Sequence, residues 1–273
     1  MKDQLRKKQD ELLELQMKRL QAPSTDLSSN NTTANAIQIL KTAINSSSID
    51  GAVTFDILHS ELSIRHLSMG SLHIFRNSVT RVLSDIPLRK MRFFNCKNAH
   101  PEDVEALIKS ATTIENLKTD EKYACSQIQE LHLRSDLIDE KGASALAEAL
   151  KTNTKLQKLD IYGNRIGEKG MNTLAEALKM NTTLQKLNLE LNSIDDLGAS
   201  AIAEALKMNT RLQNLNLENN RIEDKGASVL SEALKVNTAL QNLNLKGNRI
   251  DDKGASALAE ALKMNTTLQN LNV

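Results

Sequence analysis

The chain has 273 residues, of which 40% are hydrophobic, a composition typical of one large globular domain or two small ones. Its 35 Lys and Arg residues balance its 34 Asp and Glu residues, so the net charge of +1 gives no electrostatic reason to expect a nucleic-acid partner. There is no apolar run long enough for a signal peptide or a membrane span, and the two cysteines lack CxxC spacing; we therefore expect a cytoplasmic protein without membrane insertion.

Residues 1–21 are predicted to form a charged amphipathic helix, because apolar residues between Leu5 and Leu20 form a rough stripe through a charged background. This helix either caps the following domain or lies in solvent; alternatively it binds a partner or dimerises. Residues 22–35, rich in Ser, Thr and Asn, are predicted to be a flexible linker.

Residues 36–127 suggest irregular strand-and-helix units or a separate N-terminal cap. In LRKMRFFNC, residues 88–96, apolar residues alternate as in a strand that is buried on one side. Ile64, Leu67 and Met69 fit an earlier strand of the same kind. The spacings between successive strands, 24 and then 40 residues, predict an irregular array with an insertion.

From residue 128 to residue 273 the chain consists of five full copies and one partial copy of a 28-residue unit. The unit starting at Leu184 reads LQKLNLELNSIDDLGASAIAEALKMNTR, and the next reads LQNLNLENNRIEDKGASVLSEALKVNTA. The six copies begin at Ile128, Leu156, Leu184, Leu212, Leu240 and Leu268.

Each unit is predicted to contain a short strand, a polar turn and a helix. The opening LxxLxL alternates like a strand buried on one side, and an alanine-rich segment with leucines four residues apart follows as a helix. An asparagine after the strand is expected to be buried and to satisfy backbone groups in the turn. It is present in four units, as Asn164, Asn192, Asn220 and Asn248.

Acidic residues precede each predicted helix and a lysine closes it, so both charges oppose the helix macrodipole. A column of stacked carboxylates is also compatible with a calcium site. We favour the structural interpretation, because calcium ligands would have to come from different units without a dedicated loop.

The pattern LxxLxLxxNxI followed by a helix, at a period of 28, resembles the ribonuclease-inhibitor-type leucine-rich repeat. The resemblance implies an α/β fold: a horseshoe-shaped solenoid with parallel strands on the concave face and helices on the convex face. Similar repeats occur in NOD-like receptors and in Ran GTPase-activating protein.

The sequence contains no motif for nucleotide binding, hydrolysis or phosphoryl transfer, so we expect no catalytic residues, no cofactor and no metal site. His59, His66 and His73 are spaced seven residues apart, which fits either a metal-binding stripe or ordinary surface histidines. We favour the second interpretation, because the predicted elements do not bring the three rings together.

The candidate binding surface consists of residues that alternate with the buried strand leucines, or directly follow the strands, and therefore face the concave side. Tyr162 is the only aromatic residue among them. An ordinary solvated face is the alternative. The candidate protein-binding residues are Arg134, Lys158, Asp160, Tyr162, Lys186, Asn188, Glu190, Asn216, Glu218, Asn244 and Lys246.

These features predict a non-enzymatic intracellular scaffold that binds a partner protein on its concave face, as an adaptor or regulator in signalling. The alternative, by resemblance to Ran GTPase-activating protein, is a GTPase regulator with a small GTPase as its partner. Arg165, Arg221 and Arg249 are then candidate arginine fingers, although we favour surface ion pairs, because these arginines alternate with local acidic residues. The sequence stops after the strand of the sixth unit, so self-association through that edge, or through the N-terminal helix, is a further possibility.

Overall fold

The computed structural model describes residues 52–56, 61–65, 90–94, 128–134 and 138–273, and it places side chains from residue 128 onward. The predicted helix 1–21 and linker 22–35 lie outside the described residues, as do His59, His66 and His73.

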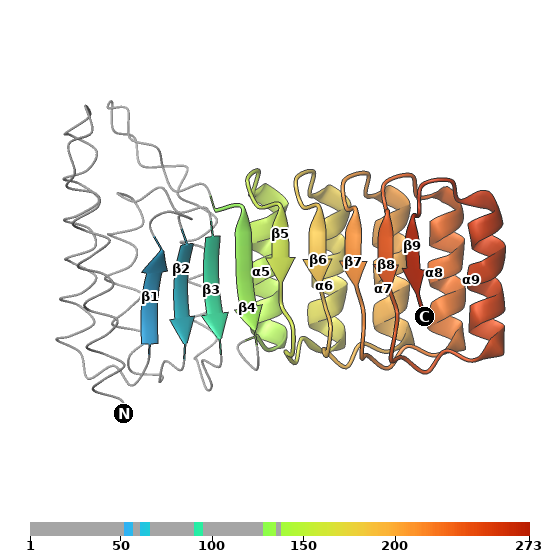
Figure 1. Ribbon diagram of the computed structural model, residues 1–273, viewed down its shortest axis with the longest axis horizontal. Coiled ribbons are helices and arrows are strands. Elements are labelled where there is room, and N and C mark those ends of the chain that lie inside the picture. The colour runs from blue at the N-terminus through green and yellow to red at the C-terminus, as the bar shows by residue number, and fades with distance from the viewer. Residues whose placement is uncertain (1–51, 57–60, 66–89, 95–127, 135–137) are drawn as a thin grey trace.

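The described strands form one sheet whose spatial order follows the chain (Figure 1). β1 and β2 are antiparallel, and every later neighbour is parallel. The strands are β1 (Ala52–Asp56), β2 (Glu61–Arg65), β3 (Lys90–Phe94), β4 (Glu130–Arg134), β5 (Lys158–Asp160), β6 (Lys186–Asn188), β7 (Asn214–Asn216), β8 (Asn242–Asn244) and β9 (Asn270–Asn272).

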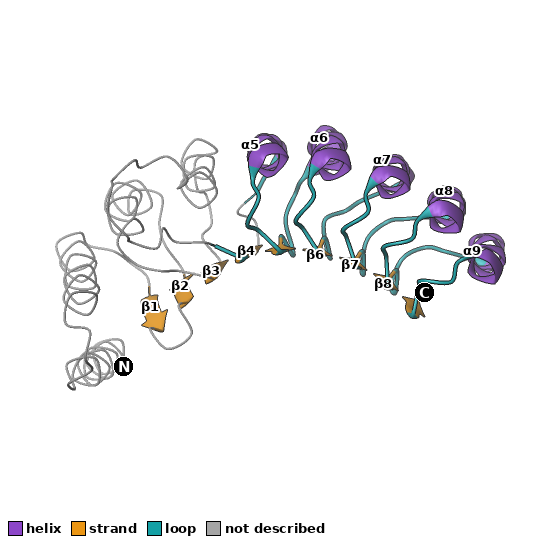
Figure 2. Ribbon diagram, turned by 90° about the horizontal axis from the view of Figure 1, so that it is seen from above, coloured by secondary structure: helices purple, strands orange, loops and turns teal. Residues whose placement is uncertain are grey.

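The described helices cover one side of this sheet and lie along the outside of an arc, with β4 to β9 on the inside (Figure 2). They are α5 (Glu140–Thr152), α6 (Gly167–Met180), α7 (Asp196–Met208), α8 (Asp224–Val236) and α9 (Asp252–Met264). The predicted α/β solenoid, with strands on the concave face and helices on the convex face, is confirmed.

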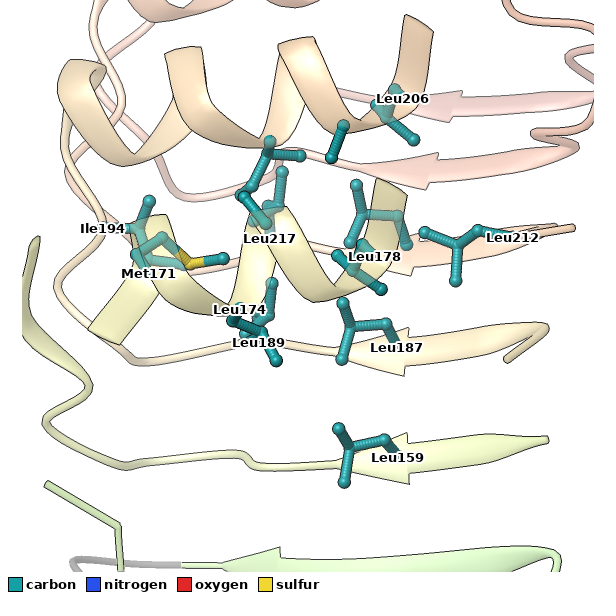
Figure 3. Packing of buried hydrophobic residues seen from close by; sticks show 14 of the residues in the cluster. Leu159, Met171, Leu174, Leu178, Leu187, Leu189, Ile194, Leu206, Leu212 and Leu217 are labelled. Carbon is teal, nitrogen blue, oxygen red and sulfur yellow. The ribbon is translucent and has the colours of Figure 1, made fainter. Parts of the chain in front are cut away.

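The period of 28 residues produces the core, because it places equivalent leucines side by side. Leu159, Leu187 and Leu215 are paired in register on adjacent strands, and all three are buried. Leu174 and Leu178 of α6 reach the same cluster from the helical layer (Figure 3). Burial of such side chains contributes on the order of 1.5–3 kcal/mol each.

The turn asparagines connect successive units as expected. Asn220 Nδ2 donates to the carbonyl oxygens of Leu189 and Leu217, while its Oδ1 accepts from the backbone N–H groups of Asn192 and Ile194. One buried side chain thus satisfies backbone groups of two units, which confirms the predicted role of this position.

A second asparagine ladder, which was not predicted, lies where each helix ends. Asn209 Nδ2 donates to the carbonyl oxygens of Leu178 and Asn181 in the preceding repeat, at 2.6 Å and 3.2 Å. Its Oδ1 accepts from the N–H groups of Arg211 and Leu212, at 2.9 Å and 2.8 Å. The equivalent positions are Asn153, Asn181, Asn237 and Asn265.

Helix capping also crosses between units. Asp139 and Asp195 cap their own helices, α5 and α7, as expected for acidic residues at a helix start. For α8 the cap comes from the preceding helix instead, because Asp196 Oδ1 accepts from the N–H groups of Glu223 and Gly226, at 2.8 Å and 2.9 Å. This arrangement ties the start of one helix to the first turn of its neighbour.

The earlier strands continue the parallel sheet, but one predicted register is wrong. Met91 and Phe93 of β3 pair with Leu131 and Leu133, as the spacing of 40 residues predicts. Ile64 was predicted to open an earlier strand, in a position equivalent to Leu88. It instead pairs with Phe93, near the end of β2, so the spacing between equivalent residues of β2 and β3 is 29 residues and not 24. Apolar residues alternate both up to Ile64 and onward from it. The backbone pairing shows that the segment ending just after Ile64 forms the strand.

Candidate functional site

The candidate site is the concave face of the sheet, where the strands are not covered by helices (Figure 2). A groove of about 630 Å³ crosses this face from β5 to β9. It is lined by strand residues, including Lys158, Lys186, Asn188, Asn216 and Asn244 of the predicted site. The structure thus brings these five residues into one groove.

One side of the groove carries Lys158 and Lys186, which we call the lysine edge. They open β5 and β6 and are paired in register. Lys158 Nζ lies 3.8 Å from Glu130 Oε2. Lys186 is exposed and forms no ion pair with any described residue.

Glu190 and Glu218, which we call the carboxylate edge, follow the ends of β6 and β7; they do not line the groove themselves but contact Asn216 and Asn244, which do. Glu190 Oε2 accepts from Asn216 Nδ2 at 3.1 Å, and Glu218 Oε2 accepts from Asn244 Nδ2 at 2.8 Å. Within the described residues, neither carboxylate has an Arg or Lys within ion-pair distance. Both edges therefore keep charge that the array itself does not neutralise.

Asparagines form the floor between the two edges. Asn188 and Asn216 accept from the backbone N–H groups two residues further on, those of Glu190 and Glu218, both at 3.0 Å. Each also donates to an acidic side chain of the preceding repeat. Asn214 is in register with Lys186 and so continues the row of the lysine edge; its backbone N–H donates to the carbonyl oxygen of Gln185, but its side-chain amide forms no hydrogen bond with another described residue.

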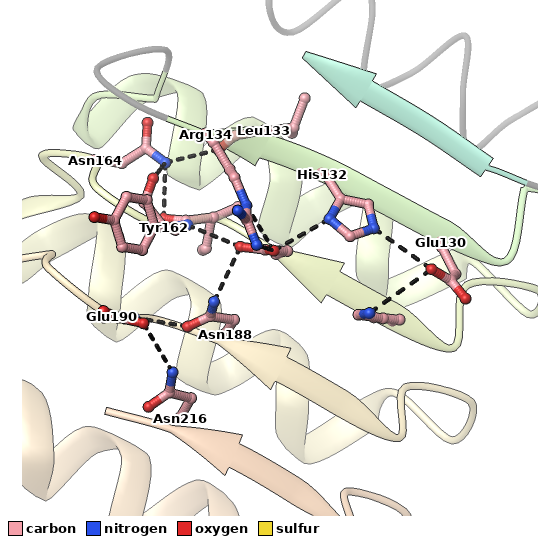
Figure 4. A network of polar contacts seen from close by, with 12 residues as sticks. Glu130, His132, Leu133, Arg134, Tyr162, Asn164, Asn188, Glu190 and Asn216 are labelled. Atoms are coloured by element: carbon pink, nitrogen blue, oxygen red, sulfur yellow. Dashed lines mark hydrogen bonds and ion pairs between the residues drawn. The ribbon is translucent and has the colours of Figure 1, made fainter. Parts of the chain in front are cut away.

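Asp160 was predicted to contact a partner, but it is buried, and its carboxylate is surrounded by His132, Arg134 and Asn188, three side chains labelled in Figure 4. It is only 2% exposed. Arg134 donates to its carboxylate through Nε at 2.8 Å and also through Nη2, and His132 Nδ1 lies 3.1 Å from Asp160 Oδ2. Asn188 Nδ2 and the N–H of Tyr162 reach the other carboxylate oxygen, both at 3.2 Å.

Burial by itself raises the pKa of Asp160, but the hydrogen bonds and charges of His132 and Arg134 outweigh it and lower the pKa to about 2. The carboxylate is therefore ionised at neutral pH and holds Arg134 in place. The Arg134 guanidinium in turn lies over the half-buried Tyr162 ring, 5.5 Å from its centroid. Asp160 organises this end of the face, while Arg134 and Tyr162 present its accessible surface.

Lys246, at the equivalent position two repeats after Glu190, is exposed. Sequence reasoning missed Leu191, which is 43% exposed beside the carboxylate edge and has a φ of 56°. Its backbone N–H donates to the carbonyl oxygen of Glu218 at 3.2 Å. Three other repeats have Gly163, Asn219 and Gly247 at this position. A leucine there is therefore unusual, and this difference could have identified it from the sequence.

Two further properties bear on the kind of site. Among residues 128–134 and 138–273, no three His, Cys, Asp or Glu side chains lie close enough together to hold a metal ion. None of the described helices is both long enough and apolar enough to cross a membrane.

Comparison with known proteins identifies the repeats. The family model described as "Leucine Rich repeat" matches residues 152–175, 181–203, 209–231 and 236–259. No curated protein matches the chain.

Among solved structures, the chain is similar to the actin-binding site 2 of leiomodin-1, at 25% identity and a TM-score of 0.46, over 59% of this chain and 89% of that one. It is also similar to a tropomodulin C-terminal domain from Caenorhabditis elegans, at 16% identity and a TM-score of 0.47, over 59% of this chain and 92% of that one. A Bacteroides fragilis protein is 13% identical, with a TM-score of 0.46, over 78% of this chain and 65% of that one.

Four consecutive matches to the family model coincide with the strand-turn-helix units and the asparagine ladders described above. The region from residue 152 to residue 259 is therefore built of leucine-rich repeats, with the strand, turn and helix of the ribonuclease-inhibitor type.

Proposed function

We propose that this protein is a non-enzymatic interaction module that binds a partner protein in the groove between its lysine edge and its carboxylate edge. The observation that carries the proposal is the unneutralised charge of Lys186, Glu190 and Glu218. On the convex face, by contrast, the lysine at the end of each described helix pairs with a glutamate three residues before it. The three concave charges have no such partner among the described residues, so they are available to a charged partner.

The scaffold also supports binding because it is already ordered. The two asparagine ladders tie the start and the end of each strand segment to the preceding repeat. A partner can therefore bind a preformed surface, and little additional ordering of the scaffold opposes association. Such a module would serve as an adaptor or regulator that holds one protein near another.

A GTPase-regulating role is the weaker proposal. Arg249 Nη1 lies 3.6 Å from Glu223 Oε1 and both side chains are well exposed, which favours a surface ion pair over an arginine finger. No specific observation favours a small GTPase as the partner.

The test is crosslinking in lysate of the source cells with three versions of the chain: wild type, a concave variant and a convex control. The concave variant combines Lys186→Gln, Glu190→Gln and Glu218→Gln; the two glutamate changes keep side-chain length and an oxygen acceptor, and the lysine change replaces the charge with a shorter polar side chain. The convex control combines Lys207→Gln, Glu204→Gln and Glu232→Gln, which changes the net charge by the same amount. We expect proteins that crosslink to the wild type and the control but not to the concave variant. Equal capture by all three would contradict the proposal.

A further inference from the structure

We infer that the segment bound in the groove is an extended peptide in which acidic and basic side chains alternate. This inference rests on the proposed function, since it specifies the partner of the same surface. It follows from the available side-chain amide of Asn214, the opposite charges of the two edges and the exposed side chain of Leu191.

The free amide of Asn214 favours an extended backbone over a helix. Asn214 is in register with Lys186, and its side-chain amide, which offers the same donor and acceptor as a peptide group, forms no hydrogen bond with another described residue. Backbone groups within a helix are already paired with one another, whereas those of an extended segment still need partners. The side chain of Asn214 can therefore bind an extended chain through its backbone.

The edges sort the side chains of such a segment by charge. Lys186 opens β6 and Glu190 lies in the turn after it, four residues later, so their Cα atoms are at most about 14 Å apart. Successive side chains of an extended peptide point to opposite sides. A segment that lies along the groove therefore directs every second residue toward the lysine edge and the others toward the carboxylate edge.

The length of the charged motif follows from the spacing of the strands. Lys158 and Lys186 are on adjacent strands, which lie about 4.8 Å apart, whereas same-side residues of an extended peptide are about 6.6 Å apart. Each edge therefore accommodates one or two side chains, so the motif is about four residues long. A shift of one residue along the groove brings like charges together, so alternation also fixes the register.

Leu191 adds an apolar contact to the carboxylate edge. It directly follows Glu190 in the turn after β6, its N–H donates to the carbonyl oxygen of Glu218, and its side chain is 43% exposed. Lysine and arginine carry an aliphatic stem below a charged head. The stem of such a residue can pack on Leu191 while its head reaches Glu190 or Glu218.

The inference is tested by fluorescence anisotropy with the full chain and three labelled dodecapeptides. One alternates Lys and Glu, the second has six Lys followed by six Glu, and the third is all Lys. We expect the wild type to bind the alternating peptide about fivefold more tightly than the block peptide, as two to three weak charge pairs would produce. The wild type should also bind the alternating peptide more tightly than the all-Lys peptide. Lys186→Glu replaces the unpaired cation of the lysine edge with an anion and should reverse this preference.

Lys207→Glu, the same charge change on the convex face, is the matched control and should leave all three affinities unchanged. Equal binding of the alternating and block peptides, no binding of either, or no effect of Lys186→Glu would each overturn the inference. If the concave variant nevertheless loses its crosslinked protein, the groove binds a partner in another form and the proposed function stands. If crosslinking is unaffected as well, both proposals fail.

Discussion

The asparagine at the end of each helix provides a direct test of how the repeats are held together. Asn209→Ala removes two hydrogen bonds to carbonyl oxygens and two from N–H groups, with lengths of 2.6, 3.2, 2.9 and 2.8 Å. Asn209 is only 4% exposed, so water cannot readily replace the lost partners. At roughly 0.5–1.5 kcal/mol per bond, and allowing for relaxation, we expect the free energy of unfolding to fall by about 3 kcal/mol.

The last repeat contains a matched position. Asn265 forms the same four hydrogen bonds, to Leu234 and Asn237 and from Thr267 and Leu268, but it is partly exposed. Solvent can reach the groups that Asn265→Ala would leave unpaired. We therefore expect a loss of about 1 kcal/mol at this position.

Urea unfolding followed by circular dichroism at 222 nm measures both losses. Asn172→Ala, an exposed position on α6, controls for the substitution itself and should change stability by no more than about 0.5 kcal/mol. Equal losses for Asn209→Ala and Asn265→Ala, or a loss below about 1 kcal/mol for Asn209→Ala, would refute the argument that burial sets the value of these bonds.

Three further predictions concern single contacts. The pKa of Asp160 is lowered from 3.8 to about 2, so its ionised form should stabilise the fold by about 2 kcal/mol above pH 4. This contribution should disappear as the pH falls toward 2. In urea unfolding at different pH values, Asp160→Asn should remove this part of the pH dependence. Asp196→Ala should lower the free energy of unfolding by about 1 kcal/mol and accelerate amide hydrogen exchange in the first turn of α8, the helix after its own. Faster exchange confined to α7 would contradict capping across repeats. Gly226→Ala would place a Cβ atom 2.6 Å from Asp196 Oδ1 and 2.7 Å from Ile222 Cγ2. We therefore expect the midpoint of thermal unfolding of this variant to fall by several degrees. An unchanged midpoint would show that the backbone there can move freely.

Much of the regular array could be predicted from the sequence, because its structural determinants recur at a fixed interval. Leu159, Leu187 and Leu215 identify the buried side of each strand, and the turn asparagine identifies a backbone group that needs a partner. Such positions have the same neighbours in every unit, so a pattern in the sequence translates directly into a contact.

The candidate site was less predictable, because its properties depend on residues that differ between repeats. Asp160 is at a concave position by its spacing, yet Arg134 and His132 of the preceding repeat bury it. Lys186 and Glu190 were both identified, but their lack of ion-pair partners appears only when neighbouring strands are aligned. The same holds for the cap that Asp196 supplies to α8, which joins residues 27 and 30 positions apart.

The sequence by itself determined the 28-residue period, the strand-turn-helix order and the buried positions of leucine and asparagine, because these depend on local alternation and on side chains that every unit shares. The tertiary structure decided which polar side chains are already paired and which remain free on the concave face. That outcome depends on contacts about one repeat apart between dissimilar residues, and no periodic pattern encodes them.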